Sequence, residues 1–142
     1  MLSTRRQGRE AALQVLYLKD VSRGAPACRQ AGLESVPDSV WSDEPLAGKT
    51  REFARRLADG VLAHQQDIDG LIRKYAENWE MSRMAAIDRG ILRLAAYELL
   101  HELDTPINVI INEALEIAKK YSTSESSKFV NGILDKIKLE RK

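Results

Sequence analysis

Two short groups of side chains, one near each end of the chain, have the types and spacing that bind nucleic acid. The candidates are Arg5, Arg6, Arg9, Lys128, Phe129 and Asn131. Arginine forks bind phosphates, an aromatic ring stacks on an unpaired base, and an asparagine amide hydrogen-bonds to a base edge. Together these residues favour an interface for single-stranded RNA. Solvated arginines and a Phe129 in the core would explain the same residues, so both interpretations stay open.

The charge of the chain is concentrated at the same two ends. The 142 residues carry a net charge of +1, but the first ten hold three arginines against one glutamate, and residues 128–142 hold five lysines and arginines against two acids. The segment between the two ends is therefore mildly acidic. Two basic ends indicate an anionic partner if the fold brings them together.

The sequence contains none of the common catalytic or cofactor motifs. Its eight glycines are isolated, which excludes GxGxxG and Walker phosphate loops, and the HExxH and GxSxG patterns are absent. Cys28 has no second cysteine to pair with, and two histidines cannot build a zinc site. His64 lies on the apolar stripe of a predicted helix, which favours a core histidine, and Asp69 has the spacing of a solvated carboxylate. We therefore expect neither an enzyme nor a cofactor or structural metal.

Helical periodicity runs through most of the chain, and no stretch alternates like a half-buried strand. The expected class is all-α, with about six to seven helices. Apolar spacing and capping residues predict helices at about 5–22, 46–75, 82–101, 106–121 and 122–137. The second of these contains Gly60 and Gly70, which could bend or split it. Ser82, Thr105 and Ser122 are the predicted N-caps of the last three helices.

The predicted helices divide into two subdomains. We expect residues 1–80 to form an N-terminal subdomain and residues 81–142 a C-terminal one, together making one compact domain. Glycine, proline and serine gather in residues 23–45, which predicts a long loop with at most one turn of helix near 28–33.

The hydropathy of the sequence indicates where the protein is located. No apolar run approaches 18 residues, and no apolar segment follows the basic N-terminus. Neither a membrane span nor a signal peptide is therefore expected, and the predicted location is cytoplasmic.

Gly132 is unusual because it interrupts the apolar face of the last predicted helix. Glycine within a helix costs about 1 kcal/mol relative to alanine. We therefore expect this position to have a purpose, and a notch that lets a neighbouring helix approach closely would provide one.

Four segments resemble, in order and spacing, the NusB family of bacterial transcription antitermination factors. They are RRQGREAALQVLY, AIDRGILRLAAYELL, PINVIINEALEIAKKY and KFVNGILDKI. The resemblance covers nearly the whole chain and is weakest across residues 23–45. KFVNGILDK is its most specific part, although a similar FVNG segment occurs in the NusB-like domain of a ribosomal RNA cytosine methyltransferase.

The resemblance implies two small three-helix bundles packed together, without cofactor or catalysis. It also implies an adaptor that binds the single-stranded boxA element of ribosomal RNA transcripts together with the ribosomal protein NusE, within an antitermination complex on RNA polymerase. By their matching positions, the resemblance implies that the following residues contact RNA: Arg5, Arg6, Arg9, Tyr17, Arg89, Lys128 and Phe129. Asp88, which looks exposed in the sequence, becomes a candidate contact to the basic partner.

Two other interpretations remain open from the sequence. A purely protein-binding helical scaffold would need no basic surface. An RNA-binding domain related to the methyltransferase would carry the same FVNG segment. A steep fall of RNA affinity with salt would favour an RNA-binding protein over the scaffold.

Overall fold

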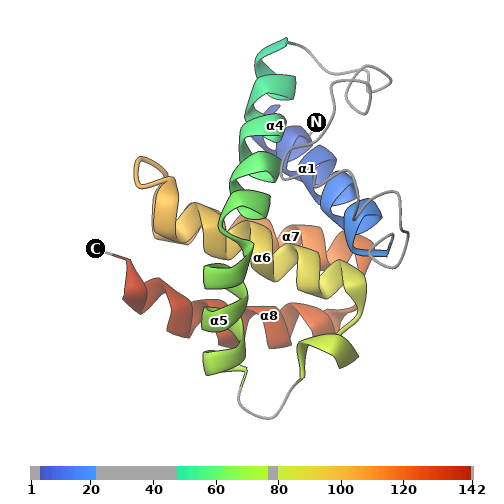
Figure 1. The fold of residues 1–142 in the computed structure, drawn as a ribbon, viewed down its shortest axis with the longest axis vertical. Helices are drawn as coiled ribbons and strands as arrows, with labels where there is room; N and C mark the ends of the chain where they lie inside the picture. The colour runs from blue at the N-terminus through green and yellow to red at the C-terminus, as the bar shows by residue number, and fades with distance from the viewer. Residues whose placement is uncertain (1–3, 22–47, 77–79, 142) are drawn as a thin grey trace. The chain divides into compact units, whose positions relative to one another are not determined.

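The computed structural model describes residues 4–21, 48–76 and 80–141, and every regular element in these ranges is a helix. The α-helices are α1 (Thr4–Val21), α4 (Gly48–Ala63), α5 (Gln65–Tyr75), α6 (Ala86–His101), α7 (Ile107–Tyr121) and α8 (Ser124–Ile137) (Figure 1). Two 3-10 helices, η1 (Met81–Arg83) and η2 (Lys138–Glu140), precede α6 and follow α8. The prediction of an all-α class is confirmed, whereas the predicted loop at 23–45 lies outside the described residues. None of the described helices is long and apolar enough to cross a membrane.

The chain divides into two compact units, unit 1 (residues 1–63) and unit 2 (residues 64–142). This division differs from the predicted boundary after residue 80, because α5 packs against α6 and α8. The C-terminal 3-10 helix strengthens this attachment. Glu140 accepts hydrogen bonds from Tyr75 Oη at 2.9 Å and from Lys74 Nζ at 3.2 Å.

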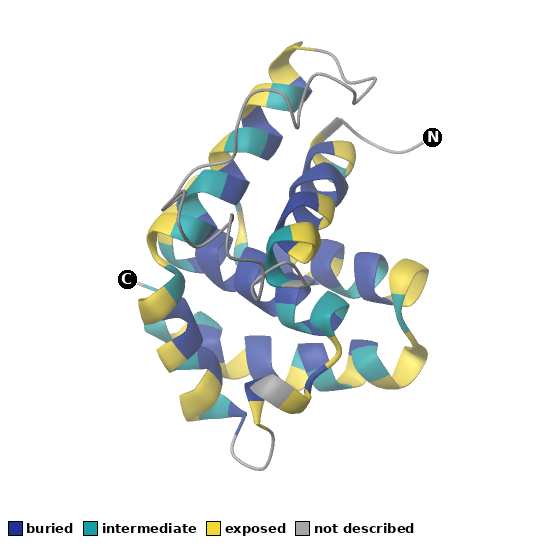
Figure 2. Ribbon diagram, turned by 45° about the vertical axis from the view of Figure 1, so that its right-hand side comes forward, coloured by how far each residue is buried: buried dark blue, intermediate teal, exposed yellow. Residues whose placement is uncertain are grey.

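Unit 1 is built on the packing of α1 against α4. Both helices bury one face, visible as the dark stripes in Figure 2, and Leu13 of α1 and Leu57 of α4 are almost fully buried. Gly8 allows the two helices to approach closely. A Cβ atom at Gly8 would lie only 2.7 Å from Cδ2 of Phe53, so no larger residue fits without displacing that ring.

Unit 2 is built around α6, which packs against α5, α7 and α8. Every residue of α6 from 90 to 99 is buried, in agreement with the apolar residues that cover more than one of its faces. The facing helices contribute buried side chains such as Ile72, Ile110 and Leu134. As predicted for the helix at 82–101, α6 is the most buried helix of the unit.

The helix predicted at 46–75 divides at His64, which lies between Gly60 and Gly70.

The starts of α6, α7 and α8 differ from their predicted caps. α6 and α7 begin after Ala85 and Pro106, and neither of these N-caps makes a side-chain capping bond. α8 is capped by Thr123, one residue after the predicted Ser122, and its hydroxyl accepts the Ser126 N–H at 3.0 Å.

Gly132 does not provide the predicted notch. It is exposed, and a Cβ atom built there would meet nothing within 4 Å. The close approach that glycine permits is found at Gly8 instead, where the apolar pattern gave no reason to expect it.

Candidate nucleic-acid interface

Three arginines of unit 1 surround the ring of Phe53. The distance from the guanidinium carbon to the ring centroid is 4.2 Å for Arg5, 5.3 Å for Arg56 and 5.5 Å for Arg9. All three lie within cation–π range. We call these four residues the Phe53 cluster. It confirms that Arg5 and Arg9 lie together, and it adds Arg56, which the sequence analysis missed.

The helical geometry explains how the Phe53 cluster forms. Arg5 and Arg9 are four residues apart in α1, and Phe53 and Arg56 are three apart in α4, so each pair shares one helix face. Gly8 then brings the two faces together. The i, i+3 spacing of Phe53 and Arg56 was visible in the sequence. Only the packing of α1 against α4 places these two residues beside Arg5 and Arg9.

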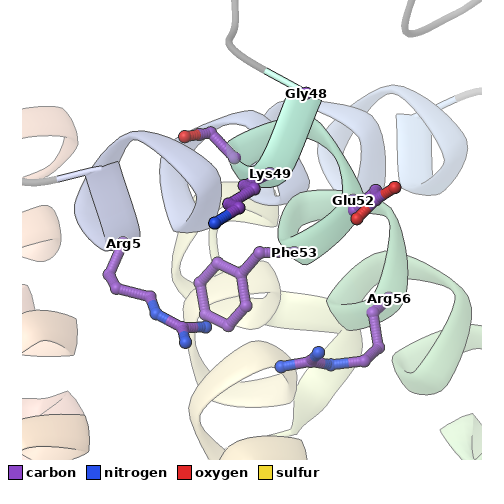
Figure 3. Close-up of a pocket in the computed structure, with 7 residues that line it drawn as sticks. Arg5, Gly48, Lys49, Glu52, Phe53 and Arg56 are labelled. Atoms are coloured by element: carbon purple, nitrogen blue, oxygen red, sulfur yellow. The ribbon is translucent and has the colours of Figure 1, made fainter.

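A cavity of about 660 Å³ opens beside the Phe53 cluster. Its lining residues are Arg5, Gly48, Lys49, Thr50, Glu52, Phe53 and Arg56. Figure 3 shows the guanidinium groups of Arg5 and Arg56 on opposite sides of the Phe53 ring, while the carboxylate of Glu52 points away from the ring. Among the described lining residues, three cations against one carboxylate make this cavity suited to an anion.

The side chains of the Phe53 cluster differ in exposure. Arg5 is exposed, whereas Arg9 is only 3% exposed and Phe53 only 6%. Arg9 and Phe53 are therefore the buried members of the cluster, and Arg5 and Arg56 are its exposed members. Arg6 is partly exposed, and the Tyr17 ring further along α1 is 40% exposed, so both have surface that a ligand could contact.

The C-terminal candidates lie in the first two turns of α8. Lys128 is exposed and its Nζ lies 3.8 Å from Glu125 Oε1, where both side chains are largely in solvent. Such a pair contributes little and leaves the lysine available. Phe129 and Asn131 are partly buried, so the Phe129 ring belongs neither wholly to the core nor wholly to the surface. The common surface predicted for the two basic groups stays a prediction, since they lie in different units.

Arg89 has a structural role in unit 2. Its Nη1 donates to the carbonyl oxygens of Met81 at 2.7 Å and Met84 at 3.0 Å. These bonds tie both flanks of η1, its first residue Met81 and its C-cap Met84, to α6. The RNA contact implied for Arg89 stays a prediction.

Asp88 does not fit the prediction of an exposed partner contact, because it is only 8% exposed. Its Oδ2 accepts a hydrogen bond from Ser126 Oγ at 2.9 Å. The Ser126 hydroxyl in turn accepts from Ser122 at 2.9 Å and from Thr123 at 3.1 Å. Asp88 therefore joins the start of α6 to the start of α8. Its burial depends on that tertiary contact, which the sequence pattern did not show.

The surroundings of Asp69 and His64 also differ from those predicted. Asp69 is buried and forms a bidentate pair with Arg93, with Nε–Oδ1 at 2.8 Å and Nη2–Oδ2 at 3.0 Å. The prediction of a solvated carboxylate was wrong because α6 supplies a buried arginine. His64 is exposed instead of belonging to the core, and its ring stacks on His101 with centroids 4.3 Å apart.

The pKa of His101 lies below its usual value of 6.5. The main cause is lost hydration of the imidazole against neighbouring side chains, and the positive charge of a protonated His64 adds to it. Asp67 and Glu102 act in the opposite direction. Tyr97 completes a cluster of three rings, with its ring centroid 5.0 Å from that of His101 and 6.1 Å from that of His64.

The described part of the chain is all-α, and in unit 1 it carries the Phe53 cluster beside a cavity lined by cations. Comparison with known proteins then identifies the family. The chain belongs to the NusB family, whose sequence profile matches residues 6–138. NusB is a family of transcription antitermination factors, which are not enzymes, and this confirms the prediction of a non-catalytic protein.

Individual relatives match over almost the full length. The chain is 49% identical to the transcription antitermination protein NusB of Geobacter sulfurreducens, over 96% of this chain and 94% of the relative. It is 42% identical to the NusB structure from T. maritima, with a TM-score of 0.82 and coverage of 99% and 94%. A structure of antitermination factors NusB and NusE with dsRNA matches with 26% identity, a TM-score of 0.79 and 99% coverage of both chains.

Proposed function

We propose that the chain is an RNA-binding adaptor of transcription antitermination. In this role it binds single-stranded boxA-type RNA of ribosomal RNA transcripts together with NusE, as part of an antitermination complex on RNA polymerase. The observation that carries the proposal is the Phe53 cluster, with the exposed Arg5 beside a cation-lined cavity. Such an adaptor acts where RNA is transcribed, which in bacteria is the cytoplasm.

Two further observations support RNA as the ligand. A structural relative of this chain was solved as NusB and NusE with dsRNA. In unit 2, the start of α8 presents the exposed Lys128 and part of the Phe129 ring. The positive end of a helix favours phosphate at such a position, and a partly exposed ring can stack on a base.

The direct test is the affinity of the purified protein for a labelled boxA-type RNA, measured by fluorescence anisotropy with and without NusE. We expect binding that weakens steeply with salt and that NusE tightens. By thermodynamic reciprocity RNA must tighten NusE binding by the same factor. A duplex of the same sequence serves as the comparison, because the proposal requires the single strand to bind more tightly. Affinity that does not respond to NusE, or no binding at all, would contradict the adaptor role.

Phe129→Ala tests the contribution of α8 to this surface. If the ring stacks on a base, the substitution costs roughly 1 to 3 kcal/mol of RNA affinity and leaves the salt dependence nearly unchanged. Arg5→Ala should instead make the salt dependence shallower, because it removes a phosphate contact. A large fall in the melting temperature of Phe129→Ala, with unchanged affinity of the folded protein, would assign the ring to the core.

A further inference from the structure

Two of the cations that line the cavity beside the Phe53 cluster were not predicted as RNA contacts. They belong neither to the KFVNGILDK motif nor to the arginine-rich N-terminus. Lys49 and Arg56 both come from α4 and line the cavity together with Arg5 of α1. We propose that this cavity holds a backbone phosphate of the bound RNA, and that Lys49 and Arg56 are RNA contacts. This inference rests on the proposed RNA-binding function and extends it from α1 to α4.

The packing of the cluster prepares its guanidinium groups for a phosphate. The Phe53 ring attracts the groups of Arg5 and Arg56, which lie 4.2 and 5.3 Å from its centroid (Figure 3). Each arginine therefore loses part of its conformational freedom before a ligand arrives, which lowers the cost of binding. Lys49 is exposed and adds a third positive charge to the same cavity.

The lining favours a phosphate over a base. Among the described residues that line the cavity, Phe53 provides the only ring, and with 6% exposure it offers no open face for stacking. The lining residues that the structure describes include no asparagine or glutamine amide to read a base edge. A volume of about 660 Å³ accommodates a phosphate together with part of its sugar. Contacts of this kind position RNA without reading its sequence.

Lys49→Gln and Arg56→Gln test the proposal, with Arg55→Gln as the matched control. Arg55 is the neighbour of Arg56 in α4, loses the same charge, and lies outside the cavity lining, where its Nε is 3.8 Å from Asp59 Oδ2. At about 0.1 M salt we expect each cavity variant to bind single-stranded RNA roughly fivefold more weakly and to reduce the salt slope by about 0.7. A boxA-type RNA and an unrelated single strand of equal length should weaken by the same factor.

Thermal melting of every variant accompanies the titrations. Arg56→Gln removes a cation–π contact and could lower stability, whereas Lys49 is exposed and is not among the cations stacked on Phe53. Lys49→Gln therefore carries the test if Arg56→Gln melts early. Cavity variants that bind RNA as tightly as Arg55→Gln would overturn the inference and leave the proposed function standing. A wild-type protein that binds no RNA would overturn both.

A small free anion, such as inorganic phosphate, could bind the same cavity cations as a backbone phosphate of RNA. The melting temperature in inorganic phosphate, compared with chloride at equal ionic strength, distinguishes the two sources. Stabilisation of the wild type by phosphate that disappears in Lys49→Gln, combined with unchanged RNA affinity of that variant, would assign the cavity to free phosphate. That result would overturn the RNA assignment. Loss of RNA affinity in the same variant would support it.

Discussion

In unit 1 three arginines gather around the ring of Phe53, whereas in unit 2 Arg93 is paired with Asp69. Arg5 is exposed and borders a cavity with further cations. The Arg93 side chain is only 6% exposed, and its guanidinium donates to both oxygens of the Asp69 carboxylate. The exposed Arg5 thus keeps positive charge at the surface of unit 1, while the charge of Arg93 is neutralised inside unit 2.

The difference shows that the surroundings of an arginine decide its role. An aromatic ring orients a guanidinium and does not cancel its charge, so the Phe53 cluster can still attract phosphate. A buried carboxylate orients it and cancels the charge, so the Asp69–Arg93 pair fixes α5 against α6. Each of the following substitutions changes one side of this comparison.

Asp69→Ala should have the largest effect, because it leaves the Arg93 charge buried without its carboxylate. We expect a loss of about 3 to 5 kcal/mol in the free energy of unfolding, measured by urea denaturation. Asp67→Ala in the same helix is the control, since Asp67 is exposed and should change stability little. RNA affinity of folded Asp69→Ala should match the wild type. A loss below about 1 kcal/mol would show that the pair does not hold the unit together.

Gly8→Ala tests unit 1, because the added methyl group crowds the ring of the Phe53 cluster. The new methyl group would begin 2.7 Å from Cδ2 of Phe53, so the ring must move. Overpacking of this kind costs roughly 1 to 3 kcal/mol, and the better helix propensity of alanine offsets about 1 kcal/mol of it. We expect a net loss of stability in a thermal or urea melt, together with weaker RNA binding as the ring that orients Arg5 is displaced. Increased stability would mean that α1 and α4 can separate freely.

Gly132→Ala should have the opposite sign. Open space surrounds this position, so only the helix propensity changes, and alanine should add up to about 1 kcal/mol to the free energy of unfolding. The pair of glycine variants thus separates a glycine that packing requires from one that it does not. A destabilised Gly132→Ala protein would argue for a contact at this surface, and a parallel RNA titration would show whether RNA makes it.

The sequence predicted the helices well because their signals are local. Apolar spacing placed α1 at 5–22, against the observed Thr4–Val21, and it identified α6 as the most buried helix. Cap positions were less accurate. Serine and threonine also hydrogen-bond outside caps, and the starts of α6 and α7 use no side-chain capping bond.

The candidate site could be predicted only where its residues are neighbours in the chain. Arg5 and Arg9 share a helix face at a fixed spacing, so their proximity followed from α1 alone. Arg56 and Lys49 join them through the packing of α4, forty or more residues further along the sequence. The burial of Asp88 likewise depends on Ser126 of α8. Periodicity contains no information about such pairings between helices.

The smallest expected effect concerns the rings of His64, Tyr97 and His101 in unit 2. A positive charge on His101 is less favourable there than the arginine charges are in the Phe53 cluster. A guanidinium over Phe53 is attracted to the ring, but protonated His101 would lose hydration and face His64. Its pKa therefore lies below 6.5 in the folded protein, while in the unfolded chain it returns to about 6.5. The unfolded state binds more protons in this range, so the contribution of His101 to stability is complete above about pH 6.5 and is lost as pH falls.

We expect the melting temperature to fall between about pH 7.5 and pH 5.5, and to fall less in His101→Gln, which cannot titrate. Glu140 does not interfere, because its pKa lies below 4.5, lowered by the hydrogen bond from Tyr75 and then by the one from Lys74. Titration of the imidazole signals by NMR provides the direct measurement. His64→Gln should raise the midpoint of His101, since it removes a neighbouring positive charge, although Asp67 and Glu102 remain. A His101 midpoint at or above 6.5 in the wild type would remove the contrast with the Phe53 cluster, because protonation would then be no harder in the folded protein than in solution.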